Sequence, residues 1–135
     1  MYLVDTNVIS ELRKAKPHGG VMAWVNQVDE KDLFISVVTL GEIQKGIEKT
    51  RMQDKPKALA FDHWLDQIAE EYNILPMTEK TFRLWAKLMH GLTDDLYEDA
   101  MIVATAIEHQ LVVVTRNVRD FSAFNIKILN PFEFK

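Results

Sequence analysis

The chain has 135 residues, of which 47% are hydrophobic, and it contains no cysteine. This length supports one hydrophobic core, so we expect a single domain over residues 1–135 that uses neither disulfides nor thiolate metal sites. The net charge of −4 has the wrong sign for binding nucleic acid by overall attraction, and no apolar run is long enough to cross a bilayer. A reducing cytoplasm is the expected location, and any nucleic-acid activity needs a local feature of the surface.

Four short apolar runs predict strands over residues 2–4, 33–36, 111–114 and 126–129. The first three are typical of buried parallel strands. The fourth ends before Asn130 and Pro131, so we expect it nearer an edge of the sheet.

Between the strands, apolar residues at spacings of three and four predict helices over residues 61–72 and 82–89, which Pro76 separates. Another predicted helix, over residues 100–107, has Asp99 at its expected N-terminus. Strands that alternate with helices predict an α/β fold, in which a parallel β-sheet is flanked by α-helices on both faces.

Polar side chains just beyond the strands are candidates for a functional site, because parallel sheets bind ligands beyond the carboxyl ends of their strands. Asp5 follows the first strand directly, and Glu42 lies a few residues past the second, where a helix is expected to begin. Asp120 follows the third strand through residues 115–117. Asp99 opens the helix that leads into the third strand, and topology alone leaves open which edge of the sheet it joins.

Several ionised carboxylates cannot share one site without a proton or a cation. Two unit charges about 5 Å apart repel by about 3 kcal/mol at an effective dielectric of about 20. Oxygen ligands and the absence of cysteine favour a hard ion, Mg²⁺ or Mn²⁺, which also accepts phosphate oxygens. A metal held in this way activates water for attack on a phosphodiester, so the four acids predict a metal-dependent nuclease.

Each acid also has a purely structural interpretation. Asp5 and Asp99 are typical helix N-caps, and Asp5 also suits an Asx-turn. Glu42 suits the first turn of a helix, where a solvated carboxylate favours the helix dipole, and Asp120 suits a turn cap. The nuclease hypothesis therefore depends on the four acids as a set at one edge of the sheet.

The stretches that contain these acids resemble the motifs of the PIN-domain family, in particular its VapC-type (FitB-like) toxin ribonucleases from bacterial toxin–antitoxin pairs. The similar stretches keep the family's order and spacing and are residues 2–12, 36–43, 99–106 and 115–121. The resemblance spans nearly the whole chain and implies a single PIN-like domain.

By this resemblance, the metal ligands and catalytic residues of a Mg²⁺- or Mn²⁺-dependent endoribonuclease are Asp5, Glu42, Asp99 and Asp120. Supporting hydrogen bonds or water contacts come from Thr6, Thr115 and Asn117. Some family members carry an acid at the position of Asn117, which leaves open whether Asp120 contacts the metal directly or through water. Three further acids have two interpretations, as a replacement metal ligand or as solvated charge, of which solvated charge is favoured; they are Asp94, Asp95 and Glu98.

The resemblance also implies partners. They are a cognate VapB-like antitoxin, a cellular RNA substrate such as a transfer RNA, and a second copy in a homodimer or dimer of dimers, with DNA contacted only through the antitoxin and no membrane contact. Among the basic residues, Arg116 is predicted to contact the RNA. The other basic residues near the motifs have two equal interpretations, as contacts to the RNA backbone or as a solvated face. They include Arg13, Lys14, Lys16, Lys45, Lys49, Arg51 and Arg119.

Two other functions stay open. A phosphohydrolase that forms an aspartyl-phosphate at Asp5 usually has a second acid two positions on, where this chain has Asn7. A protein-binding module, such as a toxin that has lost activity, would use the acidic cluster only structurally.

Overall fold

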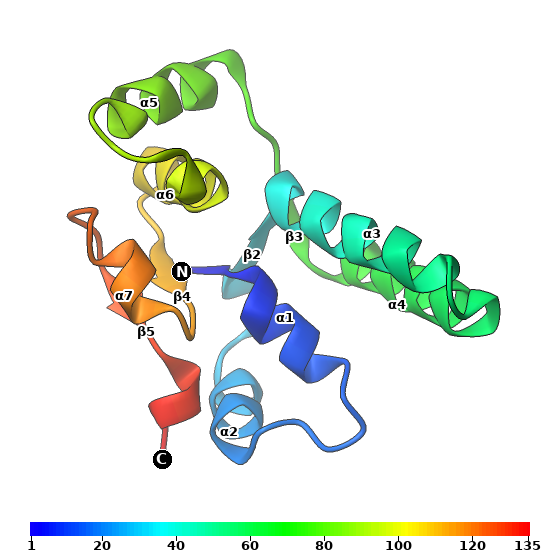
Figure 1. Ribbon diagram of the computed structural model, residues 1–135. Coiled ribbons are helices and arrows are strands. Elements are labelled where there is room, and N and C mark those ends of the chain that lie inside the picture. The colour runs from blue at the N-terminus through cyan, green and yellow to red at the C-terminus, as the bar shows by residue number, and fades with distance from the viewer.

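Five parallel strands form one sheet at the centre of the protein, in a computed structural model that describes residues 1–135 (Figure 1). Their order across the sheet is β3-β2-β1-β4-β5, and every neighbouring pair is parallel. Strand β1 is the central strand, so the residue that follows it lies in the middle of the carboxyl edge of the sheet. The strands are β1 (Tyr2–Val4), β2 (Leu33–Ser36), β3 (Asn73–Leu75), β4 (Val112–Val114) and β5 (Ile128–Leu129).

Seven α-helices cover both faces of the sheet, which confirms the predicted fold class. Helices α1 to α4 lie on one face and α5 to α7 on the other (Figure 1). Successive strand residues point to opposite faces, so Val4 belongs to the core on the α1–α4 face and Leu3 to the core on the other. The helices are α1 (Thr6–Leu12), α2 (Gly19–Gln27), α3 (Val37–Arg51), α4 (Lys55–Glu71), α5 (Glu79–Met89), α6 (Tyr97–His109) and α7 (Val118–Phe121). None of them is both long and apolar enough to cross a membrane.

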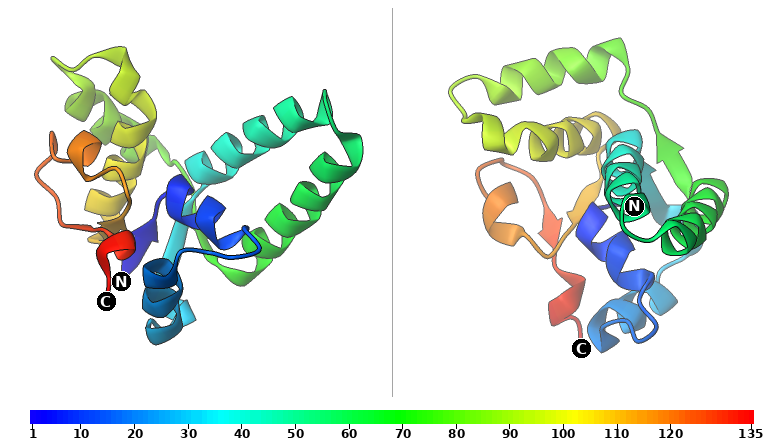
Figure 2. Two further views of the ribbon diagram at one scale, coloured as in Figure 1. Left: turned by 60° about the horizontal axis from the view of Figure 1, so that its bottom comes forward. Right: turned by 45° about the vertical axis from the view of Figure 1, so that its right-hand side comes forward.

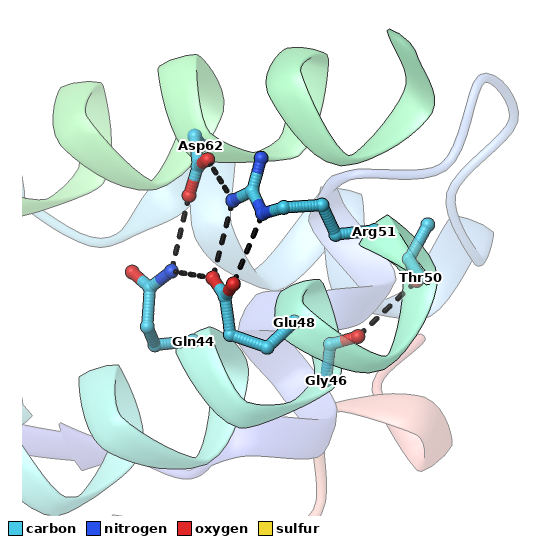
Figure 3. Close-up of polar contacts among 6 residues, drawn as sticks. All are labelled: Gln44, Gly46, Glu48, Thr50, Arg51 and Asp62. Atoms are coloured by element: carbon cyan, nitrogen blue, oxygen red, sulfur yellow. Dashed lines mark hydrogen bonds and ion pairs between the residues drawn. The ribbon is translucent and has the colours of Figure 1, made fainter. Parts of the chain in front are cut away.

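The two longest helices, α3 and α4, form a hairpin that reaches away from the sheet (Figure 2). A polar network joins them on the outside, where Arg51 of α3 pairs with both Glu48 and Asp62 (Figure 3). The side-chain nitrogen of Gln44 donates to Glu48 at 2.8 Å and to Asp62 at 3.1 Å. The buried face between the hairpin and the sheet consists of Ile43, Ile47, Ala58, Leu65 and Ile68.

Four elements differ from the expectations above. Strand β3 and helices α2 and α7 were not predicted, and α3 begins directly after strand β2, so Glu42 lies in its second turn and the first-turn placement was wrong. Ser36 accounts for the early start of α3, because its hydroxyl caps the helix by accepting the Val38 N–H at 3.0 Å. The predicted helix over residues 61–72 is the second part of α4, which ends at Glu71.

Helix α2 begins at two glycines, and one of them is required by close packing. A Cβ atom on Gly20 would lie 2.8 Å from the carbonyl oxygen of Pro131 and 2.9 Å from that of Phe134. Only glycine therefore lets α2 approach the C-terminal segment of the chain this closely. Seen in sequence alone, the paired glycines resemble a loop, which hides the helix.

Candidate active site

Asp5, the residue after the central strand, is both a buried carboxylate and the N-cap of α1. It is 5% exposed. Its Oδ1 accepts the backbone N–H of Thr6 at 2.8 Å, and its Oδ2 accepts the side-chain amide of Asn7 at 3.1 Å and the hydroxyl of Thr115 at 2.8 Å. Burial raises the pKa of Asp5, and these three hydrogen bonds oppose the rise. Asp5 is therefore the helix cap that one interpretation expected, and its carboxylate is also fixed in place at the edge of the sheet.

Thr115 and Asn7 connect Asp5 to the loop after strand β4. The Thr115 hydroxyl is fully buried, and it accepts the Asn7 side-chain amide at 3.2 Å and the Asn117 backbone N–H at 3.0 Å. Together with its bond to Asp5, this uses the one hydrogen and both lone pairs of the hydroxyl. The side-chain oxygen of Asn7 accepts the backbone N–H of Arg116 at 3.1 Å. The loops after β1 and β4 are therefore locked to each other at this edge.

Glu42 and Asp99 approach Asp5 from helices on opposite faces of the sheet. Glu42 lies in the second turn of α3 and Asp99 in the first turn of α6, and both are half-buried. The residue at the N-cap of α6 is Leu96, so the N-cap interpretation of Asp99 was wrong. The question that topology left open is resolved, because Asp99 is near enough for the charge of Asp5 to act on it.

Burial and mutual repulsion raise the pKa values of Glu42 and Asp99. Burial is the largest cause for Glu42, and the neighbouring Glu98 and Asp5 raise its pKa further, to about 7. Burial also comes first for Asp99, and the charges of Asp5 and Asp120 help to raise its pKa to about 6. These acids therefore lie close enough to repel one another, which is the electrostatic property expected of a shared cation site.

Asp120 and Thr6 lie at the rim of this group. Asp120 is exposed in the first turn of α7, and its charge contributes to the raised pKa values of Asp5 and Asp99. Thr6 follows Asp5, and its hydroxyl donates to that of Thr39 at 3.3 Å.

Asn117 and Arg116 contribute to the site through their backbones. Asn117 donates its backbone N–H to Thr115, and Arg116 donates its own to Asn7. The guanidinium of Arg116 is exposed and lies 4.6 Å from the ring centre of Phe132. Their side chains make no contact with the acids.

One residue at the site, Asn7, was not predicted from the sequence. Asn7 bridges Asp5, Thr115 and the backbone of Arg116, and its position in the first turn of a helix capped by Asp5 was the available signal. Glu98, for which solvated charge was the favoured interpretation, is exposed, and its charge helps to raise the pKa of Glu42.

The donor set fits a hard divalent cation in chemistry, although it is not a preassembled cage. All of the candidate ligands are carboxylates, and their mutual repulsion would be relieved by a positive ion. No three acidic or histidine side chains lie close enough together to form a ready-made ligand set. The residues present therefore suit Mg²⁺ or Mn²⁺, which keep several waters and need few protein ligands.

Comparison with known proteins identifies the family. A model of the PIN domain matches residues 2–127. The chain belongs to the PIN-domain family. This PIN domain is 30% identical to the toxin FitB of Neisseria gonorrhoeae and 33% identical to the VapC ribonuclease Y4jK of Sinorhizobium fredii, in each case over 98% of this chain and 99% of the relative. The crystal structure of FitAcB from Neisseria gonorrhoeae aligns with a TM-score of 0.86 at 30% identity, over 99% of this PIN domain and 100% of that chain.

Proposed function

We propose that this PIN domain is a Mg²⁺- or Mn²⁺-dependent endoribonuclease and the toxin of a toxin–antitoxin pair. The observation that carries the proposal is that Asp5, at the carboxyl edge of the central strand, has Glu42 of α3 and Asp99 of α6 near enough for its charge to raise the pKa of each. Relatives named as a toxin and a ribonuclease, similar over almost their whole length, support the same activity.

In this proposal the ion is held by Asp5, Glu42 and Asp99, with Asp120 as a direct or water-mediated ligand. The bound ion supplies an activated water and neutralises charge on the attacked phosphate. The hydrogen bonds from Thr6, Asn7 and Thr115 orient the Asp5 carboxylate beforehand. The raised pKa of Glu42, about 7, would be lowered by the bound ion, because a cation favours the charged carboxylate that ligates it.

The first prediction tests this site at Asp5. Asp5→Asn removes the charge while the amide oxygen can still cap α1, so we expect a folded protein whose Mg²⁺-dependent cleavage of bacterial RNA falls by about 100-fold or more. The matched control is Asp66→Asn, because Asp66 is exposed on α4 and makes no hydrogen bond or ion pair. Cleavage that persists in the Asp5→Asn protein would reject the assignment. Circular dichroism of both variants verifies the fold.

The structure does not favour the alternative functions. An aspartyl-phosphate enzyme usually has a second acid two positions after its nucleophile, and here that position holds Asn7, whose side-chain amide donates to Asp5 at 3.1 Å. A purely structural acidic cluster would not bind metal. Calorimetric titration with Mg²⁺ that shows no binding would therefore support the protein-binding module.

We also propose a small VapB-like antitoxin as the partner, through which alone the complex contacts DNA, and a homodimer or dimer of dimers as the assembly. A solved structure of the relative FitAB bound to a DNA fragment, 28% identical with a TM-score of 0.85, supports this arrangement. A toxin that cleaves cellular RNA acts in the cytoplasm. Light scattering of the protein alone and with its antitoxin measures both assemblies.

A further inference from the structure

A groove of about 360 Å³ runs between α1, α3 and α4 and begins at the candidate active site. Glu42 is part of both the groove and the site, so anything that fills the groove reaches the acids. Thr50 lies eight residues beyond Glu42 on α3, so the groove extends about 12 Å along that helix. The residues that line it include Ser10, Arg13, Glu42, Thr50, Lys57 and Phe61.

Two positive charges stand over one aromatic ring in this groove. The guanidinium carbon of Arg13 lies 4.1 Å from the ring centre of Phe61, and the amine of Lys57 lies 5.7 Å from the same point. Both cations therefore lie against the same ring of the groove lining. Neither is part of an ion pair, because the acid–base pairs of the structure are Lys14–Glu11, Lys31–Asp29, Arg51–Glu48 and Arg51–Asp62. Both charges are therefore available to an anion that enters the groove.

The other basic residues near Glu42 are less suited to this role. Lys14 is paired with Glu11 at 2.9 Å, and Arg51 is held in the network that joins α3 to α4 (Figure 3). Lys45 and Lys49 are exposed on α3 but do not line the groove. Arg13 and Lys57 are thus the positive charges of the groove lining, and they supply the local feature that a chain of net charge −4 requires.

The rest of the lining matches a sugar–phosphate backbone. The hydroxyls of Ser10 and Thr50 can bond to phosphate or ribose oxygens, and the 2′-hydroxyl is the group that distinguishes RNA from DNA. The groove is open at Gly46 on α3, where a Cβ atom would meet nothing within 4 Å. The Phe61 ring holds the planar Arg13 group in place, so less side-chain freedom is lost when a phosphate binds.

We propose that this groove binds the sugar–phosphate backbone of single-stranded RNA beside the cleaved bond, with Arg13 and Lys57 contacting its phosphates. This subsite rests on the proposed ribonuclease function. In this subsite the RNA backbone follows a path from Glu42 along α3 towards Lys57. It also separates RNA binding from the metal site, since neither cation contacts an acid.

The test measures Mg²⁺-dependent cleavage of total bacterial RNA as a function of salt, for Arg13→Gln, Lys57→Gln and the double variant. At subsaturating protein we expect each single change to lower the rate by about 3- to 10-fold, and to reduce the slope of log rate against log salt by about 0.7 for each lost phosphate contact. The rate at saturating protein should change much less, because binding rather than chemistry is altered. Arg13→Lys should recover most of the salt dependence.

The matched control is Arg83→Gln, which removes the same charge from α5, outside the groove. If the unmodified protein cleaves no RNA, the proposed function fails. If it cleaves RNA and the double variant has the same rate and salt slope, the groove proposal is overturned and the function stands. A double variant that keeps full cleavage but escapes its antitoxin would assign the groove to the protein partner instead. Melting temperatures of all variants distinguish these results from loss of fold.

Discussion

The hydroxyl of Thr115 is a single buried group on which the orientation of Asp5 depends. Thr115→Val keeps the shape of the side chain but removes the donor to Asp5 and the acceptor for two N–H groups. We expect metal-dependent cleavage to fall by about 10- to 100-fold, as is usual when a group that orients a metal ligand is lost. Thr115→Ser retains the hydroxyl and should keep cleavage near that of the unmodified protein. Equal losses in the two variants would show that packing, and not the hydrogen bonds, is what matters.

At this scale, the residue types of the site were predictable, while the contacts between them were not. Asp5, Glu42 and Asp99 were identified because each lies near the end of a strand or the start of a helix in chain order. Asn7 was missed because its role exists only when β1 and β4 are neighbours, since Asn7 and Thr115 are 108 residues apart. Long-range hydrogen bonds of this kind leave no local pattern.

Among the elements, the hairpin of α3 and α4 depends on one cation between two acids. Arg51 lowers the pKa values of both Glu48 and Asp62. This contribution to stability is present above the ordinary pKa values of the two carboxyls and is lost as the pH falls through their lowered values. Arg51→Met should therefore lower the melting temperature at pH 7 by a few degrees, since Glu48 and Asp62 are left facing each other.

The same variant provides its own internal control. The difference in melting temperature from the unmodified protein should shrink as the pH falls below the ordinary pKa values of the two carboxyls, and in 1 M salt, which screens their charges. A difference that is constant across pH and salt would mean that the packing of the long Arg51 side chain stabilises the hairpin, and not its charge.

Elements whose stability depends on tertiary pairing were the ones that sequence patterns failed to predict. Strand β3 has only two apolar residues, Ile74 and Leu75, after the polar Asn73, and it forms because Ile74 pairs with Ile35 of β2. Val37 and Val38 favour a strand by their branched side chains, but the hydroxyl of Ser36 caps a helix there. Long amphipathic segments such as α4 and α5 were found because their own spacing predicts them.

In the whole molecule, three carboxyls with raised pKa values lie near one edge of the sheet, namely those of Asp5, Glu42 and Asp99. The pKa of Glu42 is about 7 and that of Asp99 about 6, both above the ordinary values of 4.5 and 3.8. A carboxyl with a raised folded-state pKa favours the folded state when it is protonated. Stability should therefore decrease as the pH rises from the ordinary pKa values through the raised ones.

In chelator, we expect the free energy of unfolding to fall by about 2 kcal/mol between pH 5 and pH 8, a figure reduced for solvent screening because both carboxyls are half-exposed. Urea titrations at a series of pH values measure it. Mg²⁺ should restore this stability at pH 8 and have little effect at pH 5, where protons already occupy the acids. Glu42→Gln should flatten the profile in chelator and weaken the response to Mg²⁺, whereas Glu70→Gln, at an exposed position of α4, should change neither. A chelated protein that is more stable at pH 8 than at pH 5 would contradict the repulsion on which the proposed metal site depends.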